Sequence, residues 1–398
     1  MTGFRAVAGF LMQNKVVATI YFVTAVVASI QAILLGNHEF GGRQYTEYNN
    51  YVIFKQSFFH LLQGRNLYVL FPNEQWDLYK YSPTFALAMG SLAYLPDWLG
   101  LTLWNILNAL VLYWGIRSLP LNEKTKLSIL WFVLLELLTS IQNAQSNGLL
   151  AGLMLLAFGS YHKGHTGRAA LWLVAATFIK VYGAIGFALF FLFPQKPSFI
   201  AKAAAWTVLF AIVPLVVPGL GIAGLLAQYK NWTLMMAADQ SASYGLSVMG
   251  WLHTWFGVNG GKGVVTALGL ALFLLPYGRI TMLGQLRYQL LLLASMLIWV
   301  IIFNHKAESP TFVIAAVGAG LWYYTGPKTT VQRVAVVLFF IFTCMSPTDL
   351  FPRFVRDEIF KPYVIKAVPS IFLWVAVLWD LMTYKPLPNT EPPLHLAA

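Results

Sequence analysis

The sequence predicts an all-α integral membrane protein, on three observations. Hydrophobic residues make up 58% of the 398 residues and charged residues 10%, far below the ~25% charge typical of soluble domains. The mean hydropathy is +0.66. Apolar stretches follow one another along the chain, and a helix needs ~20 such residues to cross a bilayer. We expect one polytopic domain over residues 1–384, with about 12 transmembrane helices, within roughly 11 to 13.

Each expected helix is an apolar run between polar or basic connections. The runs fall near residues 16–35, 98–118, 127–141, 148–161, 168–179, 182–194, 203–218, 264–277, 288–303, 311–325, 334–345 and 367–384. The first run follows Arg5 and Lys15 and has no small-residue cleavage site after it, so we expect a retained helix and not a signal peptide. The runs 168–179 and 182–194 are short, which predicts tilt, local thinning of the bilayer or a broken pair of helices around Lys180.

Basic residues recur in pairs in the short connections, and the positive-inside rule places these pairs in the cytoplasm. They are Lys124/Lys126, Lys163/Arg168, Lys196/Lys202, Arg279/Arg287 and Lys328/Arg333. Both termini are then cytoplasmic, and the first loop, 37–80, faces outward. The outward connections that follow are 142–147, the neighbourhood of Lys180, 219–262, 304–310 and 346–366.

Two segments depart from this regular pattern. The apolar stretch 82–95 is too short for an ordinary span, and a crossing there would invert every later loop, so we expect it to be re-entrant or interfacial. Residues 385–398 contain four prolines and have no apolar period. We expect them to form a disordered cytoplasmic tail.

Charge and cysteine content exclude several classes of protein. The net charge is +12, but the basic residues are scattered between apolar runs and form no single basic face, so nucleic acid is not an expected partner. Cys344 is the single cysteine. A disulfide or a thiolate metal site within one chain is therefore excluded.

The loop 37–80 concentrates acidic residues, with four of the 14 in the chain. They are Glu39, Glu47, Glu74 and Asp77. Ionisable groups are costly in a lipid-embedded protein and usually mark functional positions. Apolar residues also recur at helical spacing here, from Tyr51 to Leu62, with Lys55 and His60 between them, which predicts an amphipathic helix lying on the membrane. The segment 244–256 has similar interfacial character.

Five short motifs occur in order along residues 50–310. They are Gln63-Gly64-Arg65-Asn66-Leu67-Tyr68, Tyr79-Lys80-Tyr81-Ser82-Pro83, Ala144-Gln145-Ser146-Asn147, Phe178-Ile179-Lys180 and Ser309-Pro310. Together they resemble polytopic glycosyltransferase family 87 of the GT-C superfamily. The chain departs from the family pattern at two places. Asn50 stands where the family usually has a catalytic Asp, and Ala144 stands where it has a Gly.

The resemblance implies a hexosyl- or pentosyltransferase that uses a polyprenyl-phosphate-linked sugar donor. Transfer would take place on the outer face of a bacterial inner membrane, facing the periplasm, with an acid early in the first outward loop as base. The acceptor would be a glycolipid, a cell-wall polymer or a protein. No cofactor is required in this scheme, and no metal ligand is assigned, although loop acids can also bind a divalent cation.

Transfer to a hydroxyl needs a base for the acceptor proton and a cation for the departing phosphate. The candidate bases are Glu47, Asp77 and Glu308. The candidate substrate-binding residues are Asn50, Arg65, Lys80, Gln145, Asn147, Lys180, His305 and Lys306.

Each candidate also has a simpler explanation. Glu47 is equally a solvated loop acid, and Asp77 equally a surface partner of Lys80. The segment 304–310 is equally a polar cap at a helix end. Lys180 lies between two apolar half-spans, where a lipid phosphate is the natural anion and snorkelling is the alternative. Glu136 lies within an apolar run and must face the helix bundle or be protonated.

Two other functions are consistent with the sequence. A secondary transporter of a small solute or a lipid-linked sugar would also have many spans, broken helices and buried charges, although carriers often show paired halves and this chain has no repeat. A scaffold or a degenerate transferase would account for Asn50.

Overall fold

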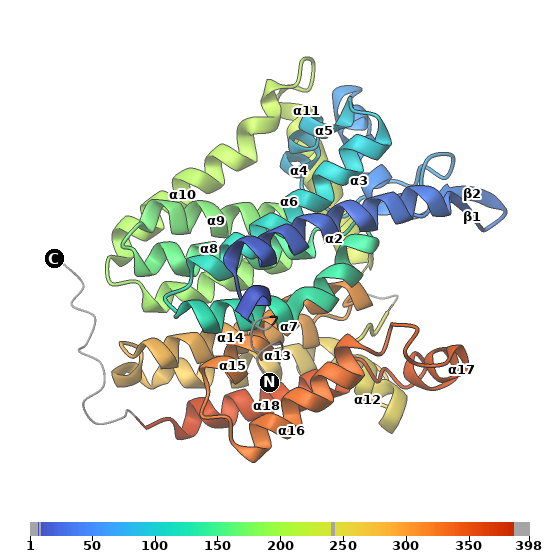
Figure 1. Ribbon diagram of the computed structural model, residues 1–398. Helices are drawn as coiled ribbons and strands as arrows, with labels where there is room; N and C mark the ends of the chain where they lie inside the picture. Colours follow the sequence, from blue (N-terminus) through green and yellow to red (C-terminus); the bar gives the residue numbers. More distant parts are fainter. Residues whose placement is uncertain (1–6, 8, 240–242, 386–398) are drawn as a thin grey trace. The chain divides into compact units, whose positions relative to one another are not determined.

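The computed structural model describes residues 7, 9–239 and 243–385. It is 74% helical, which confirms the all-α class (Figure 1). Of the predicted tail, all but Lys385 lies outside the described residues. Backbone contacts divide the chain into two compact units. The first comprises the described parts of 1–120, 137–184 and 195–242, and the second those of 121–136, 185–194 and 243–398. A single domain over 1–384 stays a prediction.

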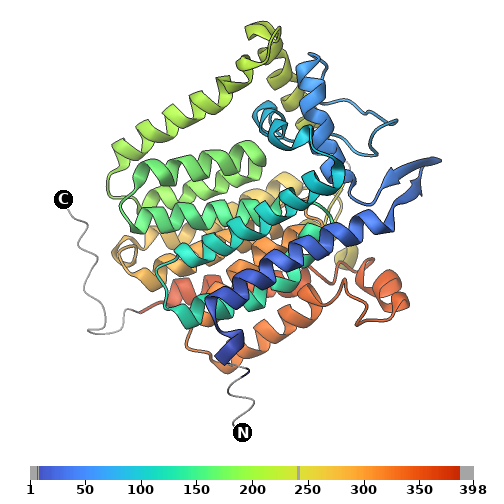
Figure 2. The same cartoon turned by 45° about the horizontal axis from the view of Figure 1, so that its top comes forward.

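Five long helices of the first unit pack one against the next in the order α2, α6, α8, α9 and α10 (Figure 2). Their bounds are α2 Asn14–Leu35, α6 Asp97–Ser118, α8 Asn147–His162, α9 Thr166–Ile179 and α10 Lys196–Ile212. Helices α6 and α8 approach closely at Gly152, where a Cβ would come within 2.5 Å of the Val111 carbonyl oxygen. Small residues allow membrane helices to pack at such short range.

Shorter elements complete the first unit. They are β1 Asn37–Phe40, β2 Arg43–Thr46, α3 Asn49–Leu62, α4 Pro83–Ala88, α5 Gly90–Ala93, η2 Val213–Val216 and α11 Gly221–Asp239. The sequence analysis missed the hairpin of β1 and β2. Its strands pair antiparallel, with Phe40 opposite Arg43. Gly41 and Gly42 form the two-residue turn with φ of 59° and 77°, a conformation that favours glycine at both positions.

The predicted amphipathic helix is present as α3, but the prediction that its apolar side lies on the membrane is wrong. Tyr51, Phe54 and Leu61 are fully buried within the protein, and Phe54 packs edge-on against Phe85 and other rings of the same unit. His60, expected on the polar side, is 3% exposed. The apolar stripe of α3 therefore packs against protein and does not lie on lipid, because the segment that follows folds back over it.

The stretch 82–95 forms two short helices, α4 and α5. The Ser82 hydroxyl caps α4 by accepting a hydrogen bond from the Phe85 N–H at 3.1 Å, and Pro83 occupies the first turn, where its missing N–H costs nothing. The break comes between Ala88 and Gly90. That this stretch is re-entrant stays a prediction.

The second unit contains the C-terminal helices. They are α12 Val248–Phe256, α13 Lys262–Leu274, η3 Leu275–Gly278, η4 Ile280–Met282, α14 Leu286–Ile302, η5 Ser309–Thr311, α15 Phe312–Thr325, α16 Thr330–Phe339, η6 Phe340–Cys344, α17 Arg353–Val355, η7 Arg356–Phe360 and α18 Val368–Thr383. Every residue of α14 from Tyr288 to Ile302 is buried. This helix packs against α13, α15 and α18, so it forms the core of the unit, as a helix that is apolar all round should.

Two further elements, α7 Glu123–Gln142 and η1 Val181–Leu192, contribute residues to both units. Of the alternatives expected around Lys180, the structure shows the broken pair of helices. Helix α9 ends at Ile179, Lys180 is extended with φ −137° and ψ 126°, and the chain continues as the 3₁₀ helix η1.

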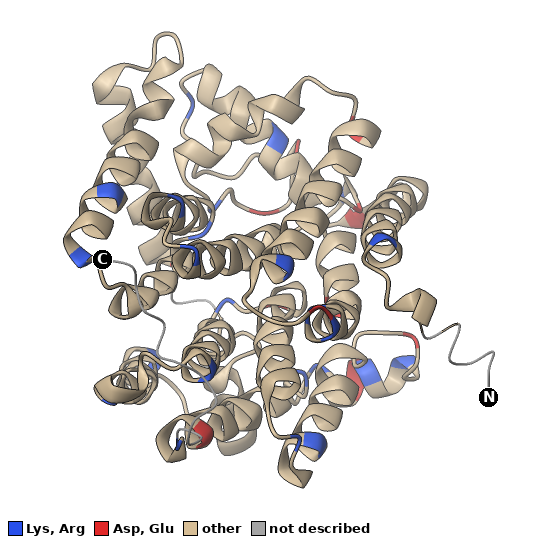
Figure 3. Cartoon of the chain, turned by 60° about the vertical axis from the view of Figure 1, so that its left-hand side comes forward, with Lys and Arg blue, Asp and Glu red and all other residues tan. Residues whose placement is uncertain are grey.

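Each of the predicted spans coincides with a helical segment, and most of the helical surface carries no charged residue (Figure 3). Within the described residues, four helices have the length and apolarity to cross a membrane: α2, α6, α7 and the continuous segment Lys196–Val216. Others are apolar but shorter, such as Leu286–Ile302. The positions of the helices are thus confirmed, and the number of crossings stays a prediction.

Candidate functional site

The helix break at Lys180 positions the side chain around which the candidate site of the first unit is built. The Lys180 ammonium donates hydrogen bonds to Asn147 Oδ1 at 2.8 Å and to Gln145 Oε1 at 3.2 Å. It also lies 5.6 Å from the ring centres of both Tyr81 and Tyr182, within the range of a cation–π contact. We call these five residues the Lys180 cluster.

The two tyrosines also bind the amides that surround Lys180. Tyr182 donates from its hydroxyl to Asn147 Oδ1 at 3.2 Å, and Tyr81 donates to Gln145 Oε1 at 3.4 Å. Asn147 is fully buried and Gln145 is 8% exposed. The amide oxygens are therefore fixed in place, and neutral oxygens orient an ammonium without neutralising it.

Four of the five sequence motifs meet at this cluster. Ser82, next to Tyr81, donates to the Phe178 carbonyl at 2.5 Å, which ties the second motif to the fourth. Tyr68, from the first motif, donates to the Tyr81 carbonyl at 3.0 Å. Short motifs far apart in the chain thus converge in one unit. The fifth motif, Ser309-Pro310, belongs to the second unit.

The loop before α8 carries the two amides and has an unusual backbone. Ala144 has a φ of 49°, in the left-handed region that glycine adopts at no steric cost. This explains why a Gly is the usual residue at the matching position of the motif. The Trp104 indole N–H donates to the Ala144 carbonyl at 2.9 Å and stabilises this conformation.

Asn50 is attached to the same loop. Its side-chain amide donates to the Asn143 carbonyl at 2.9 Å, two residues before Gln145. The position expected to carry an acid therefore lies on the loop that bears the Lys180 cluster, and this chain places a neutral amide there.

Glu47 lies just before α3, close in sequence to Asn50. It forms an ion pair of 3.0 Å with His38 Nδ1 of β1, and its side chain is 38% exposed. The hairpin that the sequence analysis missed supplies this histidine. A carboxylate that is oriented by an imidazole and still reached by solvent has the properties of a proton acceptor.

Asp77 lies in a charged group of its own. It pairs with Lys80 at 2.9 Å, as the simpler interpretation predicted, and Lys80 also lies 4.0 Å from Asp239 of α11. The main chain here is anchored as well, because the Trp232 indole donates to the Lys80 carbonyl at 3.2 Å. Arg65 is exposed, and its carbonyl accepts from Gln228 at 2.7 Å.

His60 is a functional candidate that the sequence analysis did not select. It is nearly buried, lies 2.9 Å from Glu74, and stacks on Phe71 with ring centres 3.7 Å apart. Burial lowers the pKa of His60, and this outweighs the opposite effect of the Glu74 carboxylate. The imidazole is therefore neutral at pH 7. The sequence pattern of α3 gave no indication that His60 would contact Glu74.

The polar segment 304–310 forms a tight turn in the second unit. Glu308 is exposed and forms a capping box with Thr311 at the start of η5, so the simpler interpretation as a helix cap describes its contacts. Gly245 packs against the turn, where a Cβ would come within 2.5 Å of the His305 carbonyl oxygen. The Lys306 N–H donates to Asn304 Oδ1 at 2.9 Å.

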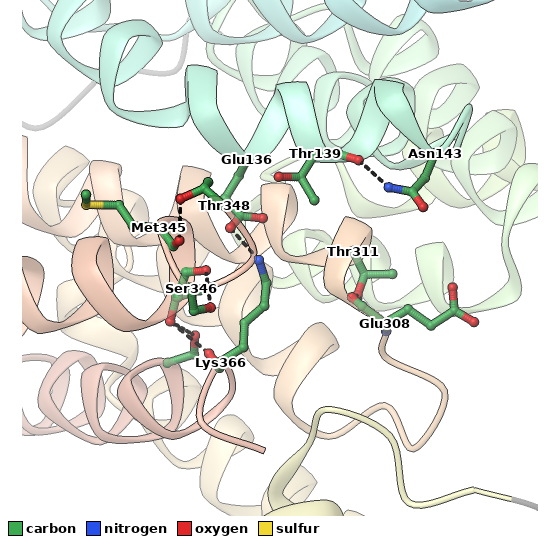
Figure 4. Close-up of polar contacts among 11 residues, drawn as sticks. Glu136, Thr139, Asn143, Glu308, Thr311, Met345, Ser346, Thr348 and Lys366 are labelled. Atoms are coloured by element: carbon green, nitrogen blue, oxygen red, sulfur yellow. Dashed lines mark hydrogen bonds and ion pairs between the residues drawn. The ribbon is translucent and has the colours of Figure 1, made fainter. Parts of the chain in front are cut away.

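Glu136 faces a basic partner within the second unit, as expected for an acid in an apolar run. Its Oε1 atom lies 2.6 Å from the Lys366 ammonium (Figure 4). Side-chain exposure is 0% for Glu136 and 5% for Lys366. This buried ion pair joins α7 to the start of α18 and has a structural role.

An apolar cavity of about 230 Å³ adjoins the Lys180 cluster. Phe178 and Ile179 line it immediately before Lys180, and Thr84 and Phe85 line it just after Ser82. Further lining residues come from α5, α6, α8 and α10. The cavity, which is suited to hydrocarbon, is thus lined by chain neighbours of Lys180 and Tyr81 and not by the five residues of the Lys180 cluster themselves.

Comparison with known families decides the class of protein. The model of glycosyltransferase family 87 matches residues 79–347, which is more than half of the chain. The chain belongs to glycosyltransferase family 87. The resemblance seen in the motifs is therefore confirmed, and a transferase of a membrane family is supported over a carrier. A search of curated proteins found no match.

The placement of the candidate residues can now be stated for this family 87 protein. The structure brings Tyr81, Gln145, Asn147 and Lys180 together and attaches Asn50 to the same loop. Glu47, Asp77, Lys80 and Arg65 lie elsewhere in the first unit, and His305, Lys306 and Glu308 belong to the second. Within the described residues, no group of three or more His, Cys, Asp or Glu side chains is arranged to bind a metal ion.

Proposed function

We propose that this glycosyltransferase transfers a sugar from a polyprenyl-phosphate-linked donor to an acceptor on the outer, periplasmic face of a bacterial inner membrane. Membership of family 87 supports sugar transfer. The observation that carries the donor assignment is that Phe178 and Ile179, the two residues before Lys180, line an apolar cavity. A lipid-linked phosphate needs a cation and a hydrocarbon surface near each other, and we assign the first role to Lys180 and the second to this cavity.

The proposed role of the Lys180 cluster is to bind the donor phosphate. The ammonium offsets the charge that develops on the phosphate as the bond to the sugar breaks. Asn147 and Gln145 orient the ammonium through their oxygens. Tyr81 and Tyr182 flank it and restrict the entry of water, which strengthens the electrostatic interaction.

Glu47 is the proposed base. It removes the proton from the acceptor hydroxyl while the hydroxyl oxygen bonds to C1 of the sugar. The bond from C1 to the phosphate oxygen breaks, its electron pair stays with the phosphate, and polyprenyl phosphate leaves. His38, 3.0 Å from Glu47, orients the carboxylate. Asn50 contributes a hydrogen bond and no proton transfer.

The other candidates have secondary roles in this proposal. Arg65, Lys80, His305 and Lys306 are candidate contacts for sugar and phosphate oxygens. Asp77 and Glu308 are alternative bases, although the contacts of Asp77 with Lys80 and of Glu308 with Thr311 match their simpler interpretations. We propose that about 12 helices cross the membrane, that both termini are cytoplasmic, and that the transfer needs no cofactor.

The test is release of polyprenyl phosphate by the purified protein. A panel of polyprenyl-phosphate hexoses and pentoses is incubated with glycolipid, cell-wall polymer and protein acceptors, and free polyprenyl phosphate is measured. The proposal predicts release that depends on both donor and acceptor. Absence of release with every donor, together with solute uptake by vesicles that contain the protein, would contradict it and favour a carrier.

A further inference from the structure

A groove and a pocket in the second unit adjoin one another and differ in character. The groove has a volume of about 650 Å³ and is lined mainly by apolar residues of α16, η6 and α18, including Val334 and Phe342, and by Ile365 in the turn before α18. The pocket has a volume of about 320 Å³ and is lined by residues that include Ser346, Phe360 and four basic side chains. Those side chains are Arg353, Arg356, Lys361 and Lys366.

Neighbouring residues line the groove and the pocket. Ile365 lines the groove and the next residue, Lys366, lines the pocket. Phe342 of the groove lies edge-on to Phe360 of the pocket, with ring centres 6.2 Å apart. Thr343, between the two, donates to the Lys366 carbonyl at 2.8 Å. An apolar groove and a pocket rich in basic residues therefore lie next to each other in the second unit.

The pocket contains polar atoms that the protein leaves unsatisfied. Arg356 Nε and Ser309 Oγ are buried and have no hydrogen-bond partner among the described residues. Burying such atoms without a partner is unfavourable, so a bound group with hydrogen-bonding oxygens would stabilise them. The turn that carries Arg356 is the π-helix η7, and π-helical turns occur frequently at functional sites.

The basic residues that line the pocket outnumber the acidic ones, and two of them also pair with acids outside the lining, Arg356 with Asp349 at 2.9 Å and Lys366 with Glu136 at 2.6 Å. Asp357 is the carboxylate that lines it, and this carboxylate is bound by Lys361 at 2.6 Å and Arg353 at 3.3 Å. The hydrogen bond from Lys361 lowers the pKa of Asp357, so the carboxylate is a poor proton acceptor. Arginine and lysine are the side chains that bind phosphate oxygens best.

The groove is open at the surface of the unit. Val331, Val334 and Phe372 line it and are 67%, 53% and 58% exposed. On a membrane protein such a surface meets lipid chains, which can enter the groove from the bilayer. An occupant with a hydrocarbon chain and an anionic head group matches both parts of the site.

We propose that the groove and pocket together bind an anionic membrane phospholipid, with one acyl chain along α16 and α18 and its phosphate on Arg356 and Lys361. This site goes beyond the proposed transfer and stands whether or not Lys180 binds the donor. A phospholipid seated here would connect α16, η7 and α18 and stabilise the turn between them.

Native mass spectrometry of the detergent-purified protein tests the proposal, with phosphatidylglycerol, phosphatidylcholine, polyprenyl phosphate and inorganic phosphate as separate probes. We expect phosphatidylglycerol to bind at least about tenfold more tightly than phosphatidylcholine. Arg356→Gln and Lys361→Gln should each weaken it about tenfold, the loss expected for one charge-assisted hydrogen bond. Lys361 is 76% exposed, so its substitution should not impair folding.

Two further variants separate the groove from general charge effects. Val334→Trp fills the groove and should weaken phosphatidylglycerol binding to the same degree. Arg333→Gln removes one charge from the other end of α16 and should change nothing. Equal binding of phosphatidylglycerol and phosphatidylcholine, unaffected by Arg356→Gln and Lys361→Gln, would overturn the proposal. Preferential binding of polyprenyl phosphate would also overturn it. So would binding of inorganic phosphate as tight as that of phosphatidylglycerol and unaltered by Val334→Trp.

Discussion

The Lys180 ammonium donates a hydrogen bond of 2.8 Å to the fully buried Asn147 Oδ1. The two residues come from different sequence motifs, one at a helix break and the other at the start of α8. Their contact brings a cation, two amide oxygens and two aromatic rings together, and the two residues before Lys180 line an apolar cavity. The account of donor binding rests on this arrangement.

Glu47→Gln should reduce turnover strongly. A general base contributes about 10²–10⁴-fold to a rate, and the amide cannot accept the proton. We therefore expect a fall of about 100-fold or more in kcat with little change in the KM for the donor. Initial rates of polyprenyl phosphate release measure this.

Asn50→Asp provides the matched test of the base. In the Glu47→Gln background it supplies a carboxylate that can bind to the loop of the Lys180 cluster. The double variant should turn over at least about tenfold faster than Glu47→Gln alone. Asp77→Asn serves as the control, because its ion pair with Lys80 predicts less than about a threefold change. An unchanged rate in Glu47→Gln, or a large loss in Asp77→Asn, would show that Glu47 is not the base.

Glu136 and Lys366 should contribute to stability as a pair. Removing one partner leaves a buried uncompensated charge, so Lys366→Met should lower the free energy of unfolding by about 3–5 kcal/mol. The double variant with Glu136→Leu should recover most of that loss, since a matched apolar pair is often neutral. Denaturation in detergent measures both. Additive losses in the double variant would contradict the pairing.

His60 should make stability depend on pH. Its pKa is lowered in the folded protein by burial, while the unfolded chain titrates near 6.5. The unfolded state therefore binds more protons below about pH 6.5. The contribution of the neutral His60 to stability is complete above that pH and is lost as the pH falls. The wild-type protein should lose more stability than His60→Gln between pH 7 and pH 5. Parallel curves for the two proteins would refute this.

A chelator should leave transfer unaffected. The proposed reaction uses Lys180 and other cations where some transferases use a metal ion, so activity in EDTA should stay within about twofold of the untreated rate. The same assay with added Mg²⁺ or Mn²⁺ is the control. A loss of activity in EDTA that either ion restores would assign loop acids such as Asp77 to metal binding.

The sequence predicted the helices well because apolar runs of suitable length have few other ways to satisfy their backbone in a membrane. It also included a break at Lys180 among three alternatives, because the apolar runs on either side are too short for ordinary spans. The hairpin at Gly41-Gly42 was missed although that dipeptide favours such a turn, because the flanking strands are polar and only four residues long.

Contacts between distant residues were beyond the sequence. Lys366 lies 230 residues from Glu136, and no periodicity connects them. The contact of the Tyr182 ring with Lys180 and the contact of His60 with Glu74 likewise depend on how the elements pack. The motifs indicated Gln145, Asn147 and Lys180 as candidate substrate-binding residues, but the hydrogen bonds among them required the fold.

The most direct test of the central claim is binding of polyprenyl phosphate to the purified protein with Lys180 intact and substituted. We predict that Lys180→Gln weakens binding of polyprenyl phosphate about tenfold or more and lowers kcat by about 100-fold. Lys180→Arg should retain part of the affinity and part of kcat. Lys230 is an exposed lysine of the same unit, and Lys230→Gln should change neither quantity. Equal affinity for polyprenyl phosphate in the wild type and in Lys180→Gln would contradict the account.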